Sequence, residues 1–254
     1  MRPIYLKYEA LILGILSLGL IALVWQVVVD LGWINPFFVS SPSRVFEALL
    51  TQLENGILVQ HIGATLLAFA IALAISASLG IALGLIAGWY RDVESALEPF
   101  IWFTYSAPTI AFYPIFIAFL GYGMATIVLI AVLFSLTPIY ANTLSGIRNA
   151  DRDLVRAAIS FGAKPADIFL KFALPGSVPI IVAGLRLGVG RALTGVVVAE
   201  LFGATSGLGF SIAQYSQRLQ TTGMMVSIVT VIVLGVILTQ ILSWIERRTD
   251  SWRV

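Results

Sequence analysis

The chain has 254 residues, of which 59% are hydrophobic and only 11% are charged, and its formal net charge is +2. A soluble domain of this length has about 25% charged residues, so we expect this chain to lie in a lipid bilayer. It has no cysteine and one histidine, His61. This excludes disulfides, thiolate chemistry and multi-histidine metal sites, and no basic run of the kind that binds nucleic acid is present.

The first apolar run covers residues 10–29 and follows the polar start MRPIYLKYE. About 20 residues is the length that a helix needs to cross the hydrocarbon core. It is longer than the apolar part of a secretory signal, and VVVDLGWINP after it offers no small-residue cleavage site. We therefore expect a retained transmembrane anchor.

Five further spans are expected along the chain. The charge-free stretch from Pro99 to Ile147 is long enough for two of them, with a turn at residues 121–123 where two glycines allow the needed backbone. The prolines Pro108, Pro114 and Pro138 are expected to bend the helices that contain them. The expected spans are 10–29, 62–90, 99–120, 124–147, 175–201 and 222–245. The predicted fold class is thus an all-α polytopic membrane protein, with residues 1–254 as one transmembrane domain.

The lysines and arginines predict the orientation of these spans. If the N-terminus is cytoplasmic, eleven of them lie in cytoplasmic segments and only Arg44 and Arg218 lie outside, while Arg186 and Arg191 fall within the fifth span. An excess of positive charge marks the cytoplasmic side. We therefore expect both termini in the cytoplasm, and glycines spaced by four residues (80, 84 and 88; 184 and 188) to form close helix contacts.

Polar residues within the spans are candidates for a translocation path. Arg191 lies deep in the fifth span and Glu200 near its outer end, and charges at such depth face a bundle interior or a partner. Their separation of nine residues places them on opposite faces of one helix, so each needs its own partner. A structural role in hydrogen bonds between helices is an equally open alternative. The candidates are Ser106, Tyr113, Asn142, Arg191 and Glu200.

A charged stretch, DRDLVRAAISFGAKPADIFLKF, interrupts the apolar sequence at residues 151–172. It predicts two short helices. Asp151 or Asp153 caps the first, Gly162 ends it in a left-handed conformation, and Pro165 begins the second. Such a knob suits a groove on another protein, although an amphipathic loop on the membrane surface would show the same pattern.

The stretch RAAISFGAKPADIFLKFALPGSVPIIVAGLR (156–186) resembles the coupling loop of ABC importer permeases. That pattern is Glu-Ala-Ala, three residues, Gly and a distal Leu-Pro, and Arg156 stands here in place of the usual glutamate, which puts any salt bridge of that glutamate in doubt. SSPSRVFEALL, NTLSGIRNAD and GLRLGVGRALTGVVVAELFGATSGLG are similar to the nitrate, sulfonate and taurine branch. The candidate coupling residues are Arg156, Ala157, Ala158, Gly162, Ala163, Leu174 and Pro175.

The resemblance implies a type I ABC importer permease of six helices. Such a subunit works as a homodimer or with a close paralogue, binds a cytoplasmic ABC ATPase dimer, receives solute from an extracytoplasmic binding protein, and lies in the bacterial cytoplasmic (inner) membrane. Substrates of this branch include nitrate, sulfonates, taurine and vitamin precursors. No lysine of this chain follows a glycine, so the chain has no P-loop. We expect no cofactor and no enzyme activity here, with ATP and Mg²⁺ bound by the ATPase.

Two other classes remain to be compared. An ion-coupled secondary transporter is expected to have buried carboxylates near the midplane or an inverted repeat, yet no acidic residue occurs between Pro99 and Ile147 or in the first, second and sixth runs. An intramembrane enzyme would need a catalytic constellation, and none is visible. The importer permease is the favoured hypothesis, and the secondary transporter is the alternative.

Overall fold

The computed structural model describes residues 4–35 and 37–249. They form helices and connecting turns, with no β-strand in these ranges, which confirms the predicted all-α class. The helices in chain order are α1 (Ile4–Asp30), α2 (Pro42–Glu54), α3 (Ile57–Trp89), α4 (Arg91–Ser106), the 3₁₀ helix η1 (Thr109–Phe112), α5 (Tyr113–Leu120), α6 (Met124–Arg148), α7 (Arg152–Ser160), α8 (Pro165–Ile168), the π-helix η2 (Phe169–Ala173), α9 (Leu174–Gly203), α10 (Leu208–Gln217) and α11 (Thr221–Thr249).

By length and composition, five helices in the described part are able to cross a membrane. They are α1, α3, α6, the continuous helix from Pro165 to Gly203, and α11. The pair α4 and η1–α5 makes a sixth span if its two bent halves are counted together. The described helices therefore give the six spans that the apolar runs predict when the bent pair is counted as one span, and five when it is not.

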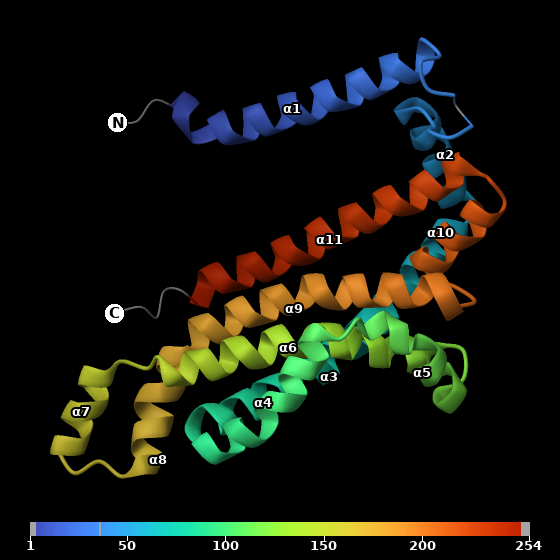
Figure 1. Ribbon diagram of the computed structural model, residues 1–254. Helices are drawn as coiled ribbons and strands as arrows, with labels where there is room; N and C mark the ends of the chain where they lie inside the picture. Colours follow the sequence, from blue (N-terminus) through green and yellow to red (C-terminus); the bar gives the residue numbers. More distant parts are fainter. Residues whose placement is uncertain (1–3, 36, 250–254) are drawn as a thin grey trace.

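Helix α6 forms the centre of the bundle, packed between α3 and α9 (Figure 1). Glycines allow this close packing. A Cβ at Gly84 of α3 would lie 2.6 Å from the Cβ of Thr143, and one at Gly184 of α9 would lie 2.6 Å from the Cβ of Asn142. The glycine stripes predicted from the sequence thus lie where two helix backbones meet across α6, as expected where no hydrophobic effect draws helices together.

The third expected span is two helices rather than one kinked helix. Helix α4 begins at Arg91 and ends at Ser106, and the chain bends by 90° at Ala107–Pro108 before η1 and α5. The bend at Pro108 agrees with the predicted break. Pro114 lies in the first turn of α5, where its missing N–H leaves no hydrogen bond unmade. Pro138 lies inside α6, which is a continuous helix on both sides of it.

Helices α1 and α11 lie at the edge of the bundle. Only 6% of the most apolar stretch of α1 is buried, against 56% for α6. Gln26 joins α1 to the start of α2, since its amide oxygen accepts from Ser43 N at 3.1 Å and its amide nitrogen donates to Ser43 Oγ at 3.2 Å. An apolar helix with so little protein contact needs lipid or another chain around it.

The short helices mark two ends of the molecule. Helices α2 and α10 lie at one end, and α7 and α8 lie at the other, which is also the end where α1 begins and α11 ends (Figure 1). The charged stretch of residues 151–172 is therefore on the same side as the two outermost helix ends.

Candidate functional site

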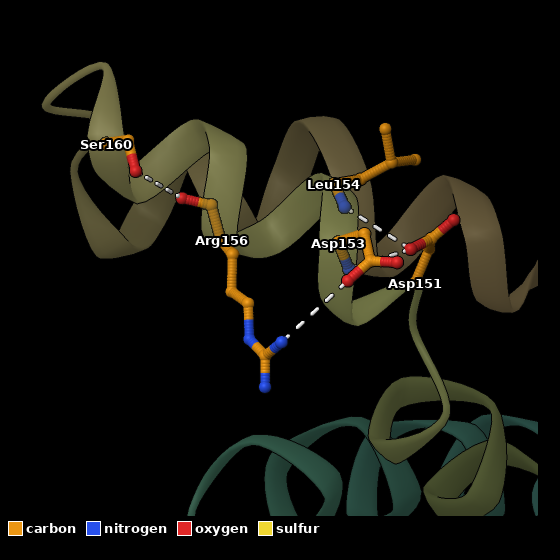
Figure 2. Close-up of polar contacts among 5 residues, drawn as sticks. All are labelled: Asp151, Asp153, Leu154, Arg156 and Ser160. Carbon is orange, nitrogen blue, oxygen red and sulfur yellow. Dashed lines mark hydrogen bonds and ion pairs between the residues drawn. The ribbon is translucent and has the colours of Figure 1, made fainter.

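The first half of the charged stretch folds as its capping residues predict. The Asp151 carboxylate accepts hydrogen bonds from the backbone N–H groups of Asp153 (2.8 Å) and Leu154 (3.3 Å), as Figure 2 shows. These bonds satisfy N–H groups that have no partner within α7. Gly162 has φ +76°, the left-handed conformation expected of the residue that follows a helix. The structure confirms both predictions.

The second half of the charged stretch does not form the separate short helix that was expected. Pro165 begins α8, as predicted, but α8 continues through η2 into α9 without a break. Lys171 pairs with Asp167 at 2.7 Å across this stretch. Figure 1 shows α8 running across the direction of α9. Within residues 151–172, only α7 is therefore a separate short helix. Pro175 lies in the first turn of α9.

Helix α7 and the residue that follows it expose apolar side chains. Phe161 is 91% exposed and Leu154 is 53% exposed, whereas Ala158 is 7% exposed and faces the bundle. Single exposed apolar residues are common on protein surfaces, but an aromatic ring with almost no intramolecular contact suits a pocket on a partner. An apolar contact surface (Leu154, Ala157 and Phe161) thus lies on a short helix and the residue that follows it, between two spans.

The predicted coupling residues do not form one surface. Arg156 and Ala157 are exposed on α7, and Gly162 is exposed just after it. Ala163 and Leu174 are half-buried, and Pro175 is exposed in the first turn of α9. The Arg156 guanidinium lies 3.9 Å from Asp153, and its backbone carbonyl accepts a hydrogen bond from the Ser160 hydroxyl (Figure 2). The Ala-Ala and Gly positions lie together, and the Leu-Pro positions belong to the next span.

At the opposite end of the bundle, the start of α10 is held by side chains from two other helices. The backbone N–H of Gly207 donates to His61 Nδ1 (3.1 Å), that of Leu208 to Thr65 Oγ1 (2.8 Å), and that of Gly209 to Glu200 Oε2 (2.8 Å). Three N–H groups that a helix start leaves unpaired thus find partners. We call these residues (His61, Thr65, Glu200 and 207–209) the outer clasp.

Glu200 is the centre of the outer clasp. It is 2% exposed, and the Thr65 hydroxyl lies 2.9 Å from Oε1 and 3.0 Å from Oε2. A Cβ at Gly207 would lie 2.3 Å from the carboxylate, and one at Gly209 would lie 2.3 Å from the carbonyl oxygen of Val197. The carboxylate is therefore enclosed by backbone that only glycine permits so close. The hydrogen bonds supply the separate partner that the sequence predicts Glu200 to need.

The sequence alone did not point to His61 or Thr65. Their i, i+4 spacing on α3 places both on one helix face, and the Gly-x-Gly spacing at 207–209 is a signal of close backbone approach. Neither pattern predicts which carboxylate the two segments meet, because Thr65 and Glu200 are 135 residues apart in the chain.

The remaining path candidates are spread over several elements. Ser106 is exposed at the end of α4. Tyr113 is buried against Gly203, and its hydroxyl has no hydrogen-bond partner in the described residues. Asn142 donates to the Pro138 carbonyl (2.8 Å) and packs on Gly184. Arg191 is exposed on α9, with no ion pair in the described part of the chain. A single chain does not bring these side chains together.

The known proteins that are similar in sequence to this chain are named as permease proteins of transport systems. A probable ABC transporter permease protein of Brucella abortus (strain 2308) is 35% identical over 84% of this chain and 85% of its own length. The taurine transport system permease protein TauC of Escherichia coli (strain K12) is 31% identical over 94% of this chain and 89% of its own. The putative aliphatic sulfonates transport permease protein SsuC of the same organism is 34% identical over 93% and 90%.

A solved structure shares the fold. The MetNI methionine ABC transporter in an inward-facing conformation matches with a TM-score of 0.64 and 20% identity, over 76% of this chain and 96% of that chain. The family model for the binding-protein-dependent transport system inner membrane component matches residues 80–251. The family that the coupling-loop motif predicts is therefore confirmed, and this chain belongs to the inner membrane components of binding-protein-dependent transport systems.

Proposed function

We propose that this chain is the transmembrane permease subunit of an ATP-driven importer in a bacterial cytoplasmic membrane. ATP hydrolysis takes place in a separate dimer of ATPase subunits, and α7 is the element that this dimer moves. The observation that supports this role most strongly is the exposed apolar surface of α7, with Phe161 at 91% exposure. A helix of nine residues is only marginally stable by itself and depends on packing against other surfaces. An exposed aromatic ring beside such a helix is therefore best explained by a partner that covers it.

The position of α7 supports a cytoplasmic ATPase. Helix α7 lies on the same side as the first turn of α1 and the last turn of α11 (Figure 1), and eleven of the fifteen Lys and Arg residues fall in the segments of that side. Positive residues favour the cytoplasmic side. The termini and α7 then face the cytoplasm, while α2, α10 and the outer clasp face the extracytoplasmic solute-binding protein.

Arg191 supports a functional unit of two permease chains. It lies 17 residues from the start and 12 from the end of α9, which is about 26 Å and 18 Å along the helix axis. Side chains tilt toward the helix start, here toward the membrane centre, so the guanidinium does not reach the nearer headgroups. A charge exposed to lipid at this depth is costly. A second copy or a close paralogue packed on this face would enclose it.

The second copy offers Arg191 no carboxylate in return. Glu200 is the only acidic residue in the six expected spans, and its oxygens are already bonded within the outer clasp. A water-filled path between the two chains is then the remaining way to solvate the guanidinium. We place the translocation path there, with Arg191 and Thr194 on the exposed face of α9 as its lining.

The transported solute is proposed to be small, such as taurine, another sulfonate, nitrate or a vitamin precursor. Two of the relatives above are named for taurine and for aliphatic sulfonates. The extracytoplasmic binding protein is expected to make most of the selection, because it binds the solute first. Thermal stabilisation of that binding protein by a panel of these solutes would identify the substrate.

Co-purification with the ATPase tests the role of α7. The variant Phe161→Ser removes the exposed ring directly after α7, and Phe119→Ser on α5 is the matched control, with its ring 84% exposed at another place. We expect Phe161→Ser to remain in the membrane and to lose its ATPase, whereas Phe119→Ser retains it. Equal retention by both variants would show that α7 is not the docking element.

No observation favours the ion-coupled secondary transporter over the importer. Such a transporter needs a carboxylate that exchanges ions with a water-filled cavity. Glu200 is buried and its hydrogen bonds join α9 to α3 and α10, which is a structural arrangement. Uptake by the purified chain in liposomes without any ATPase would support this alternative instead.

A further inference from the structure

A cavity of about 580 Å³ lies between α7 and the neighbouring ends of α3, α6 and α8. Three of its lining residues are arginines and none is acidic; the others are apolar or small. The lining residues are Gly88, Trp89, Arg91, Ile147, Arg148, Ala150, Val155, Arg156, Ile159, Pro165, Ile168 and Ala173. The cavity therefore combines positive charge with an apolar wall.

Two of the three arginines lack a close acidic partner. Arg148 forms an ion pair with Glu94. Arg156 reaches only Asp153, at 3.9 Å, with both side chains largely exposed, and such a pair contributes little. Arg91 has no ion pair within the described residues. Figure 2 shows the Arg156 side chain extending from α7 toward the ribbons below it, which agrees with its place in the cavity wall.

The cavity lies where the spans end. Helix α3 ends at Trp89 and α6 ends at Arg148, and both residues line it. The Trp89 ring packs edge-to-face on Phe169, with centroids 5.0 Å apart, and tryptophan is typical of the level of lipid headgroups. Val155 and Ile159 of α7 close the apolar wall from the opposite side. An occupant would thus meet charge and hydrocarbon surface at headgroup depth.

We propose that this cavity binds an anionic phospholipid. Its phosphate lies between Arg91 and Arg156, and the part of its acyl chain next to the glycerol lies along the apolar wall. Basic pockets at the ends of membrane helices bind such headgroups. A soluble anion would use the arginines alone and leave the apolar wall in water. An acidic segment of a protein partner would more readily meet the outward side of α7 than this inward side. The site does not depend on the proposed importer function.

Native mass spectrometry of the purified full-length chain, titrated with phosphatidylglycerol, tests the site. We expect Arg91→Gln and Arg156→Gln each to weaken binding about fivefold, and the double variant roughly 25-fold, because each surface cation contributes about one kcal/mol to the attraction. Lys164→Gln is the matched control. It removes one charge from an exposed residue of the same loop that does not line the cavity, and we expect a change of less than about twofold.

Three further measurements complete the test. Arg91→Lys with Arg156→Lys keeps both charges and is expected to retain binding, as is the wild type in an excess of phosphatidylcholine. If sn-glycerol 3-phosphate displaces the lipid at equal concentration, the site is one for a free anion and the proposal is wrong. It is equally wrong if Lys164→Gln weakens binding as much as Arg156→Gln does, or if the double variant binds phosphatidylglycerol as tightly as the wild type.

Discussion

At the scale of single residues, the buried carboxylate of Glu200 on α9 joins its own helix to the neighbouring α10 and to α3, which lies 135 residues away in the chain. Replacing it with leucine would leave the Thr65 hydroxyl and the Gly209 N–H buried without an acceptor. Each such group costs about 1–3 kcal/mol, so we expect Glu200→Leu to lower the free energy of unfolding by roughly 2–6 kcal/mol. Glu200→Gln keeps one acceptor oxygen and should lose less. Unfolding of the purified chain, followed by circular dichroism, measures both.

The exposed Glu47 on α2 provides the control for this series, because Glu47→Gln makes the same chemical change on the surface. Its unfolding should match that of the wild type. Equal stability of Glu200→Leu and the wild type would mean that the outer clasp does not stabilise the fold.

Gly84 tests the packing of α3 on α6. In Gly84→Ala the new methyl group would lie 2.6 Å from the Thr143 Cβ and 2.9 Å from the Tyr140 carbonyl oxygen, so the helices must separate. Overpacking of this kind costs about 1–3 kcal/mol. Gly63→Ala on the same helix meets no atom within 4 Å and should be neutral or slightly stabilising, because alanine favours helix. A thermal unfolding series of the two variants decides between close packing and a loose contact.

At the scale of elements, α10 depends on a glycine at its start. Gly207 has φ +115°, and a Cβ there would overlap the Glu200 carboxylate. We expect Gly207→Ala to release the start of α10, so that trypsin cleaves after the exposed Arg218 several times faster than in the wild type. Gly121→Ala has the same kind of positive φ (+76°) with no atom within 4 Å. It introduces the same kind of backbone strain away from α10, and it should leave cleavage at Arg218 unchanged.

Local signals in the sequence predict the elements better than their joints. The caps Asp151, Gly162 and Pro165 act within a few residues, so the sequence is sufficient to place α7. The continuity of α8 with α9 was not predicted, because Pro175 is as compatible with the first turn of a new helix as with the turn that follows the π-helix η2. The outer clasp depends on contacts over more than 130 residues, and no local pattern indicates them.

At the scale of the whole molecule, the bundle has a rigid centre and two ends that differ in chemistry. Helices α3, α6 and α9 share glycine contacts along their length, so α9 connects α8 and η2 at one end with the outer clasp at the other. Packed helices shift as bodies and do not bend freely. A movement imposed through α7 on α8 would then reach Glu200 and α10 through one element.

Arg191 tests whether two such chains enclose a path. In a reconstituted importer with its ATPase and binding protein, we expect Arg191→Leu to reduce solute uptake more than about tenfold, corresponding to 1.4 kcal/mol or more in the rate. Leu187→Ala, on the same exposed side of α9, is the control and should retain most of the uptake. If Arg191 faces lipid instead, Arg191→Leu would keep full uptake. Its free energy of unfolding would then rise by about 2.5–3.5 kcal/mol, which is the measured cost of inserting an arginine at the centre of a membrane helix. Uptake and stability measured on the same preparation therefore separate a water-filled path between two chains from a charge held in the bilayer.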